Sequence, residues 1–264
     1  MNKIVGVQDP ISIKIERVLD HLEAVKNAVD DDIATYSNNV IVEANGKETL
    51  DLPEPAPWIS VFAGEFIYQL RSTLDHMAFD LVKANRSDIV LAPEWEERCQ
   101  FPIWSDLKIG QTPPLPYGAF KNLPGIPRAA HAIIESAQPY YPPDSRTTAA
   151  NTSLGLLNRL SNIDKHRRLA LTRTRAKVHH RIVYKSGVTG DSLITLDDGA
   201  EVPPPDNWKD DPIVDVQRSM TITVAFDERS ALGDATTVSV IDLLQVIMDG
   251  VMLNVIAPLK PYLH

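Results

Sequence analysis

The sequence predicts an α+β fold in which long helices form a bundle and a small antiparallel sheet is inserted between the fourth and the C-terminal helix. Two segments near the N-terminus repeat apolar residues with helical spacing, and a later segment alternates in the manner of strands. Helices and strands segregated along one chain are typical of an α+β domain. We expect a single domain over 1–264, with a helical core at about 11–84, 127–167 and 238–257, and a β-rich part at about 168–230 together with a hairpin at 38–52.

The N-terminal part is expected to hold two long helices, 11–34 and 58–84, joined by a hairpin. Asn45-Gly46 is a strong signal for a two-residue turn, and the prolines that follow the second strand end the hairpin. Each helix has an apolar stripe on one face. The stripes are formed by Ile15, Val18, Leu19, Leu22 and Val25, and by Phe62, Phe66, Leu70, Leu74, Met77 and Leu81.

The remaining elements are separated by prolines. Segment 86–127 lacks long periodicity and is predicted to be a long ordered loop. A third helix follows Pro127 and ends near Gln138, and a fourth spans about 149–166. The strands are predicted at 168–185, 191–196 and 218–226, and the last helix at 238–257.

Composition indicates a soluble globular protein, with 44% hydrophobic and 23% charged residues. The only cysteine, Cys99, excludes an intrachain disulfide and suits a reducing cytosol, so we expect a cytoplasmic protein. Segment 238–257 is apolar, but Asp242, Gln245 and Asp249 form a polar stripe on it, which favours a buried helix over a membrane span. Its wide apolar arc also suits a homodimer through long helices.

A cationic block at 159–181 departs from the acidic character of the chain. It holds eight Lys and Arg residues and one acid, Asp164, so its net charge is +7 in a chain of net charge −9. Such asymmetry predicts a local anion-binding surface. On its helical half, Arg159, Asn162 and His166 share one stripe, and such a stripe could bind a phosphodiester. The alternative is structural, because cations at a helix C-terminus are favoured by the helix dipole.

The strand half of the block alternates with a period of two. Five basic residues, Arg173, Arg175, Lys177, His179 and Arg181, are expected on one face of the strand. A nucleic-acid backbone is one partner for such a face. The alternative is pairing with acids of adjacent strands, such as Asp191, Asp197 or Asp198.

Two helical segments carry an Arg followed four to six residues later by His. Arg71-Ser-Thr-Leu-Asp-His76 resembles the R-x4–6-H signature of HEPN-type ribonucleases, as does the pair Arg159 and His166. In that family, two such helices meet across a dimer or between two modules and form a composite site. The segments GEFIYQLRSTLDHMAFDLV and LGLLNRLSNIDKHRRLAL also look like parts of bacterial proteins without an assigned activity.

The resemblance implies metal-independent RNA cleavage, in which the 2′-OH attacks the adjacent phosphate. His76 and His166 would act as acid and base, Arg71 and Arg159 would stabilise the phosphorane, and Asn162 would position it. Two alternatives stand beside it: a surface ion pair between Arg71 and Asp75, and an interior or interface His76 near Glu65 and Ser72. The phosphate backbone of the RNA would be bound by the basic residues of the block, Lys165, Arg167, Arg168, Arg173, Arg175, Lys177 and Arg181.

Other chemistry has no motif. No metal-ligand set and no nucleotide or nucleophile signature is found, so no metal and no cofactor is predicted. The leading hypothesis is an RNA-binding, HEPN-like endoribonuclease. The competing one is a non-catalytic binding or regulatory protein that docks an anionic ligand or acidic partner on the cationic strand face.

Overall fold

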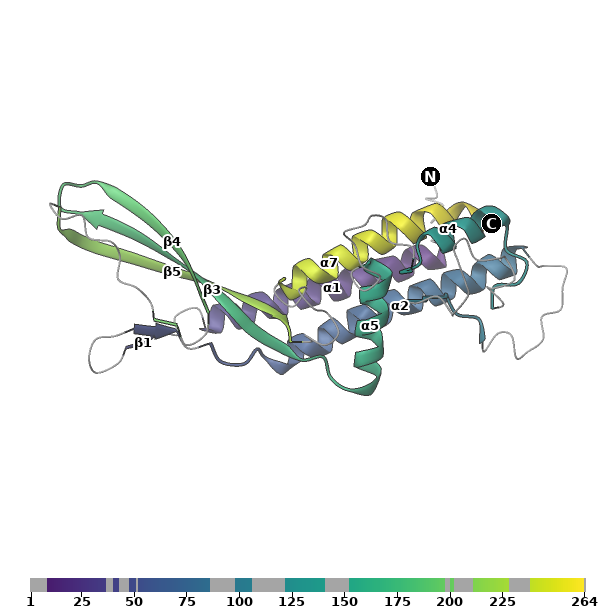
Figure 1. Ribbon diagram of the computed structural model, residues 1–264, viewed down its shortest axis with the longest axis horizontal. Helices are drawn as coiled ribbons and strands as arrows, with labels where there is room; N and C mark the ends of the chain where they lie inside the picture. Colours follow the sequence, from purple (N-terminus) through teal and green to yellow (C-terminus); the bar gives the residue numbers. More distant parts are fainter. Residues whose placement is uncertain are drawn as a thin grey trace, which may run out of the picture.

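A computed structural model shows an elongated molecule with a helical bundle at one end and a twisted sheet that projects from it (Figure 1). The predicted α+β class is confirmed, and the sheet follows the fourth predicted helix. The residues that the structure describes are 9–36, 40–42, 48–50, 52–85, 98–105, 122–140, 152–197, 200–201, 211–227 and 238–263.

Two long helices form the base of the bundle. α1 (Pro10–Tyr36) and α2 (Pro57–Asn85) run antiparallel, because Lys14 contacts Ser72 near one end while His21 contacts Glu65 farther along. Their bounds agree with the prediction within two residues at each end. The apolar stripe of α2 is buried as expected, with Phe66, Leu70 and Leu74 almost fully covered.

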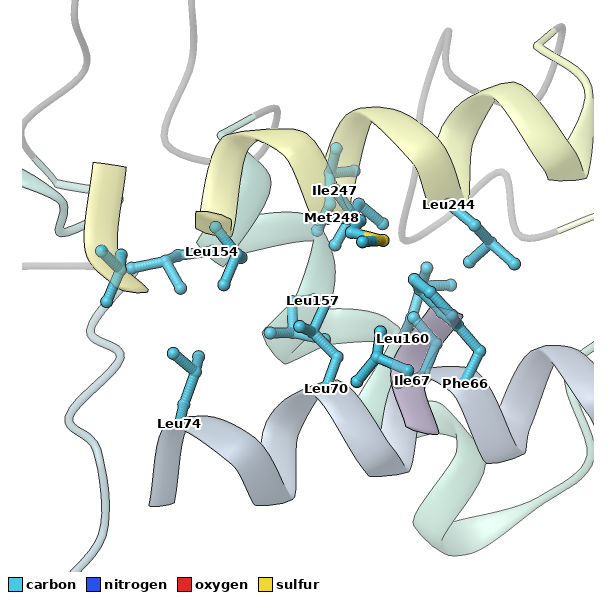
Figure 2. Close-up of a cluster of buried hydrophobic side chains, with 14 of the residues drawn as sticks. Phe66, Ile67, Leu70, Leu74, Leu154, Leu157, Leu160, Leu244, Ile247 and Met248 are labelled. Atoms are coloured by element: carbon cyan, nitrogen blue, oxygen red, sulfur yellow. The ribbon is translucent and has the colours of Figure 1, made fainter. Parts of the chain in front are cut away.

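Two shorter helices complete the core. α5 (Ser153–His166) lies against α2 and against α7 (Val240–Val251), and leucines from all three helices meet between them (Figure 2). Burial of such side chains stabilises the fold by about 1.5–3 kcal/mol each. The labelled side chains there are Phe66, Ile67, Leu70, Leu74, Leu154, Leu157, Leu160, Leu244, Ile247 and Met248.

The C-terminal segment continues the line of α7 with changing helical geometry. Ser239 begins α7 by accepting a hydrogen bond from the Asp242 amide at 3.1 Å. A π-helical turn at Met252–Ile256 is followed by α8 (Ala257–Leu259) and a 3₁₀ turn at Lys260–Tyr262. Within the described residues, Val240–Tyr262 is long and apolar enough to span a bilayer by length and composition; Leu244, Ile247 and Val251 on it are fully buried against the bundle.

The other described elements agree with the sequence analysis in outline. α4 (Arg128–Ser136) follows Pro127, and a short antiparallel pair, β1 (Val40–Val42) and β2 (Glu48–Leu50), forms the predicted hairpin. Asn45-Gly46 and most of the 86–127 loop lie outside the described residues. In the described part of that loop, Phe101 is buried in the main core.

The projecting sheet, which we call the arm, consists of three antiparallel strands in the order β4-β3-β5. β3 (Leu171–Tyr184) is central, between β4 (Thr189–Asp197) and β5 (Ile213–Phe226). β5 begins five residues before its predicted start. Ala176, Val178, His180 and Ile182 point to the buried face of β3, whereas Lys177 and Arg181 are exposed.

A β-bulge near the start of β3 changes the predicted alternation. Arg173 pairs with Val224 and Arg175 pairs with the adjacent Thr223, so one extra residue is accommodated between them. An extra residue inverts the faces on its two sides. Arg173 therefore lies on the buried face, and the prediction that it shares a solvent face with Lys177 is wrong.

The buried Arg173 joins the arm to the bundle. Its guanidinium forms an ion pair with Asp32 of α1 and donates to the carbonyls of Pro53 and Glu54. Both charged side chains are fully buried, and Asp32 also accepts the Ala56 amide at 3.1 Å. Arg173 is thus a structural residue and not part of an anion-binding surface.

Candidate functional site

The C-terminal end of α5 presents an unbroken run of exposed basic residues. Lys165 and His166 lie in the last turn of the helix, and Arg167, in extended conformation, and then Arg168 follow it. All four side chains are exposed. We call these residues, Lys165 to Arg168, the α5 basic surface.

The predicted stripe of Arg159, Asn162 and His166 adjoins this surface. Asn162 and His166 are exposed, while Arg159 is half-buried and burial lowers the pKa of its guanidinium. That shift has no carboxylate among its causes. The stripe therefore offers a cation, an amide and an imidazole to solvent, and no described acid competes for the Arg159 charge.

A groove lies between α5 and the outer side of α2. It has a volume of about 370 Å³ and is lined by Ser60, Val61, Gly64, Glu65, Tyr68, Asp164 and Arg168. Its walls are mainly apolar, and it opens beside Arg168 of the α5 basic surface. Large side chains at its edge are unusually exposed, with fractional exposures of 45% for Val61 and 66% for Tyr68.

The outer face of α2 continues beyond the groove. At 100° per residue, Trp58, Val61, Glu65, Tyr68 and His76 fall within about 80° of one another. All five are exposed, and Trp58 keeps 53% of its surface. Two aromatic rings thus lie on the same helix face as the groove, where bases or other flat groups can stack.

Asp164 forms one wall of the groove against the backbone of α2. A Cβ atom on residue 64 would lie 3.0 Å from Asp164 Cγ and closer still to Oδ1, so this packing requires glycine. Burial raises the pKa of the Asp164 carboxyl. Among the described residues, no hydrogen-bond donor or cation is paired with it, although Arg168 lines the same groove.

The other acid of the groove is engaged elsewhere. The carboxylate of Glu65 lies 3.6 Å from Nδ1 of His21 on α1. Ser60 donates its hydroxyl hydrogen to the Leu169 carbonyl at 2.6 Å, which fixes the chain just after the α5 basic surface. Asp164 is therefore the acceptor in the groove that has no described partner.

The predicted residues on α2 have different surroundings. Arg71 donates to the Phe101 carbonyl at 2.7 Å and lies 3.1 Å from Asp75, and Asp75 accepts the Phe101 amide at 2.9 Å. The alternative ion pair with Asp75 is thus present, and it positions the Phe101 segment. Burial is the main cause of a lowered pKa of Arg71.

His76 is exposed, but it does not meet His166 within one chain. Asp164 packs on Gly64, and His76 lies twelve residues farther along α2, about 18 Å of helix rise. Beyond Asp164 the chain runs toward Ser60, away from His76. The structure does not bring the two predicted His residues together inside the protomer.

On the arm, the strand half of the cationic block is exposed only in part. Lys177 and Arg181 face solvent on β3, between threonine, serine and glutamine of β5 and residues of β4. His179 lies 3.1 Å from Asp191, as the pairing alternative predicts. Arg175 is opposite Asp197 in the backbone register, and Asp198 lies outside the described residues.

The groove is not among the predictions from the sequence, in which Asp164 is only the one acid of the cationic block and Gly64 has no role. A glycine within an otherwise regular helix pattern is the available signal, because it marks close approach of another element.

Within the described ranges, no cluster of three or more His, Cys, Asp or Glu side chains could hold a metal ion. Comparison with models of protein families, with curated proteins and with solved structures finds no match.

Proposed function

We propose that this protein binds single-stranded RNA through the α5 basic surface and the adjoining groove. The observation that carries this proposal is that Arg168 belongs to both features, so that a cationic strip and an apolar groove edged by exposed Tyr68 are continuous. Single-stranded nucleic acids are bound by this combination of cations that follow the backbone and aromatic rings that stack on bases.

The charges of the whole molecule localise such binding. The chain carries a net charge of −9, so a polyanion is repelled from most of its surface. At the end of α5, four exposed basic residues follow one another from Lys165 to Arg168, so attraction for a polyanion is concentrated there. Phosphates would contact Lys165, His166 and Arg168, while bases turn toward α2. Arg173 takes no part, because its charge is buried and paired with Asp32.

Binding is tested by fluorescence anisotropy with a labelled heptauridine RNA at several salt concentrations. The double variant Lys165→Glu/Arg168→Glu should weaken binding at least tenfold and reduce the slope of log K against log salt by about 1.4, since two phosphate contacts are lost. The matched control, Arg98→Glu/Arg128→Glu, changes the net charge equally at two exposed sites away from α5. Equal effects of the two variants would contradict the proposal.

A second candidate function is the metal-independent RNA cleavage that the HEPN resemblance implies. The observation that favours it is the alignment of Arg159, Asn162 and exposed His166 next to the α5 basic surface. Because His76 is distant in the same chain, it could act with His166 only across two copies, which agrees with the homodimer expected from the long helices.

Cleavage is tested with purified protein in EDTA and a 5′-labelled RNA. We expect products with 2′,3′-cyclic phosphate ends, and loss of cleavage in His166→Ala and in His76→Ala. His179→Ala, a histidine paired with Asp191 on the arm, is the control and should retain activity. A mixture of the two inactive His variants should regain part of the cleavage activity once heterodimers form, because one of the two composite sites then has both histidines intact. Cleavage that persists in both His variants would exclude this mechanism.

A further inference from the structure

We propose that the groove between α2 and α5 selects guanine among the bases of a bound RNA strand, with Asp164 as the acceptor that recognises its edge. This inference rests on the proposed RNA-binding function and assigns a base specificity to the same site. It depends on three residues that line the groove together: Asp164, Arg168 and Tyr68.

The first argument concerns the state of Asp164. Its carboxylate is pressed against the Gly64 backbone and partly removed from water, yet no described donor is bound to it. A desolvated carboxylate without donors carries a cost that a ligand can remove by donating hydrogen bonds. A ligand with two adjacent N–H groups would satisfy both carboxylate oxygens at once.

The second argument concerns the charge of the occupant. Arg168 lines the same groove and forms no ion pair with Asp164, so the groove offers an acceptor and a cationic donor at separate positions. A basic side chain or a free amine would be attracted by Asp164 but repelled by Arg168. A neutral ligand with donors on one side and acceptors on another satisfies both groups.

Guanine has this arrangement. Its N1–H and N2–H groups donate to a carboxylate, and its O6 and N7 atoms accept from arginine. Adenine offers only its N6 amino group as a donor, and uracil only N3–H. The Tyr68 ring, 66% exposed at the edge of the groove, supplies a flat surface on which the base stacks. A base in the groove leaves its phosphates outside, beside Lys165 and His166.

Glu65 is the rival acceptor and provides an internal control. It lines the same groove, but its carboxylate is 3.6 Å from the His21 ring and is exposed. The Glu65→Gln variant should therefore keep the preference for guanine. Asp30→Asn, at an exposed position of α1, controls for the loss of one negative charge.

The test compares heptamer RNAs of the form UUUXUUU, in which X is guanine, hypoxanthine, adenine or uracil. Wild-type protein should bind the guanine strand about tenfold more tightly than the uracil strand, with hypoxanthine intermediate because it lacks the N2 amino group. Asp164→Asn should bring all four affinities within about twofold of that for heptauridine. Glu65→Gln and Asp30→Asn should keep the wild-type order, and thermal unfolding verifies that each variant is folded.

The outcomes separate the two proposals. Equal affinity of wild type for all four strands would overturn guanine selection and leave RNA binding intact. Absence of binding to every strand would overturn both. Direct binding of a labelled heptalysine peptide to wild type, lost in Asp164→Asn, would assign the groove to a basic peptide and also overturn the inference. Tyr68→Ala, which removes the stacking ring, should weaken binding of the guanine strand about tenfold, whereas Tyr68→Phe should keep the wild-type affinity.

Discussion

Gly64 and Asp164 are packed so closely that a Cβ atom on residue 64 would lie 3.0 Å from the carboxyl carbon of Asp164. This contact joins α2 to the last turn of α5, and both residues line the groove together with Arg168 and Tyr68. Because Gly64 has no side chain, the carboxylate of Asp164, one hundred residues later in the chain, can pack against the backbone of α2.

Replacing Gly64 with alanine should displace Asp164. Overpacking costs about 1–3 kcal/mol, whereas alanine is favoured over glycine in a helix by about 1 kcal/mol. We expect a net loss of up to about 2 kcal/mol in the free energy of unfolding, measured by urea denaturation.

The same change in an Asp164→Ala background should stabilise the protein or leave it unchanged, because only the helix propensity remains. This change of sign is the control for the contact itself. A loss of the same size in both backgrounds would show that residue 64 is limited by something other than Asp164.

The Asp164 carboxyl should make stability depend on pH in an unusual direction. Burial raises its pKa in the folded state above the ordinary value of 3.8. The folded protein therefore holds this proton more tightly, so the contribution of Asp164 to stability is full below 3.8 and is lost as pH rises through its folded pKa. Asp164→Asn should gain stability relative to wild type from pH 3.5 to pH 7.

Denaturation at both pH values measures that difference, and carboxyl NMR of Asp164 gives its pKa directly. The charged neighbours in the groove, Glu65 and Arg168, are retained in both proteins, so the two proteins differ only at the Asp164 carboxyl. If the difference in the free energy of unfolding between the two proteins is the same at pH 3.5 and at pH 7, the raised pKa of Asp164 is contradicted.

The ion pair between Asp32 and Arg173 should be needed for folding and not for ligand binding. Arg173→Ala leaves the buried Asp32 carboxylate without its cation, which costs about 3–5 kcal/mol. The protein that remains folded should bind RNA with wild-type affinity. Replacement of both residues, Asp32→Leu with Arg173→Met, should recover most of the lost stability because no unpaired charge is left.

The cap at the N-terminus of α5 should contribute less to the free energy of unfolding than the ion pair between Asp32 and Arg173. The Thr152 hydroxyl accepts the Gly155 amide at 3.1 Å, and Thr152→Ala should lower the free energy of unfolding by about 1 kcal/mol. Thr152→Ser keeps the acceptor and should remain near wild type. Equal losses in both variants, measured by thermal unfolding, would show that the methyl group and not the cap contributes the stability.

The sequence predicts the helices well because their apolar residues recur over many turns. The stripes of α1 and α2 extend over several helical turns each, so errors at single positions cancel, and the predicted bounds fall within two residues of the observed ones. The strands of the arm were found for the same reason, although the start of β5 was placed five residues too late.

The site was harder to predict because it depends on contacts between distant segments. The bulge before Arg175 shifts the alternation by one residue, and strand periodicity alone cannot show it. The groove depends on Gly64 and Asp164, which no local motif connects. The exposed cations at Lys165 to Arg168 could be predicted, since charged residues at a helix end remain in solvent.

The place where Arg173 joins the arm to α1 also divides the molecule into parts that should open independently. Leu171 and Phe226 belong to the core of the bundle, whereas Ala176, Val178 and Ile222 form a smaller cluster with Leu52. Segments with few apolar contacts to the rest of a protein open at lower free energy than its core. Amide hydrogens from Val178 to Tyr184 should therefore exchange with deuterium while those of the leucines in Figure 2 stay protected, so that the arm behaves as a cooperative unit of its own.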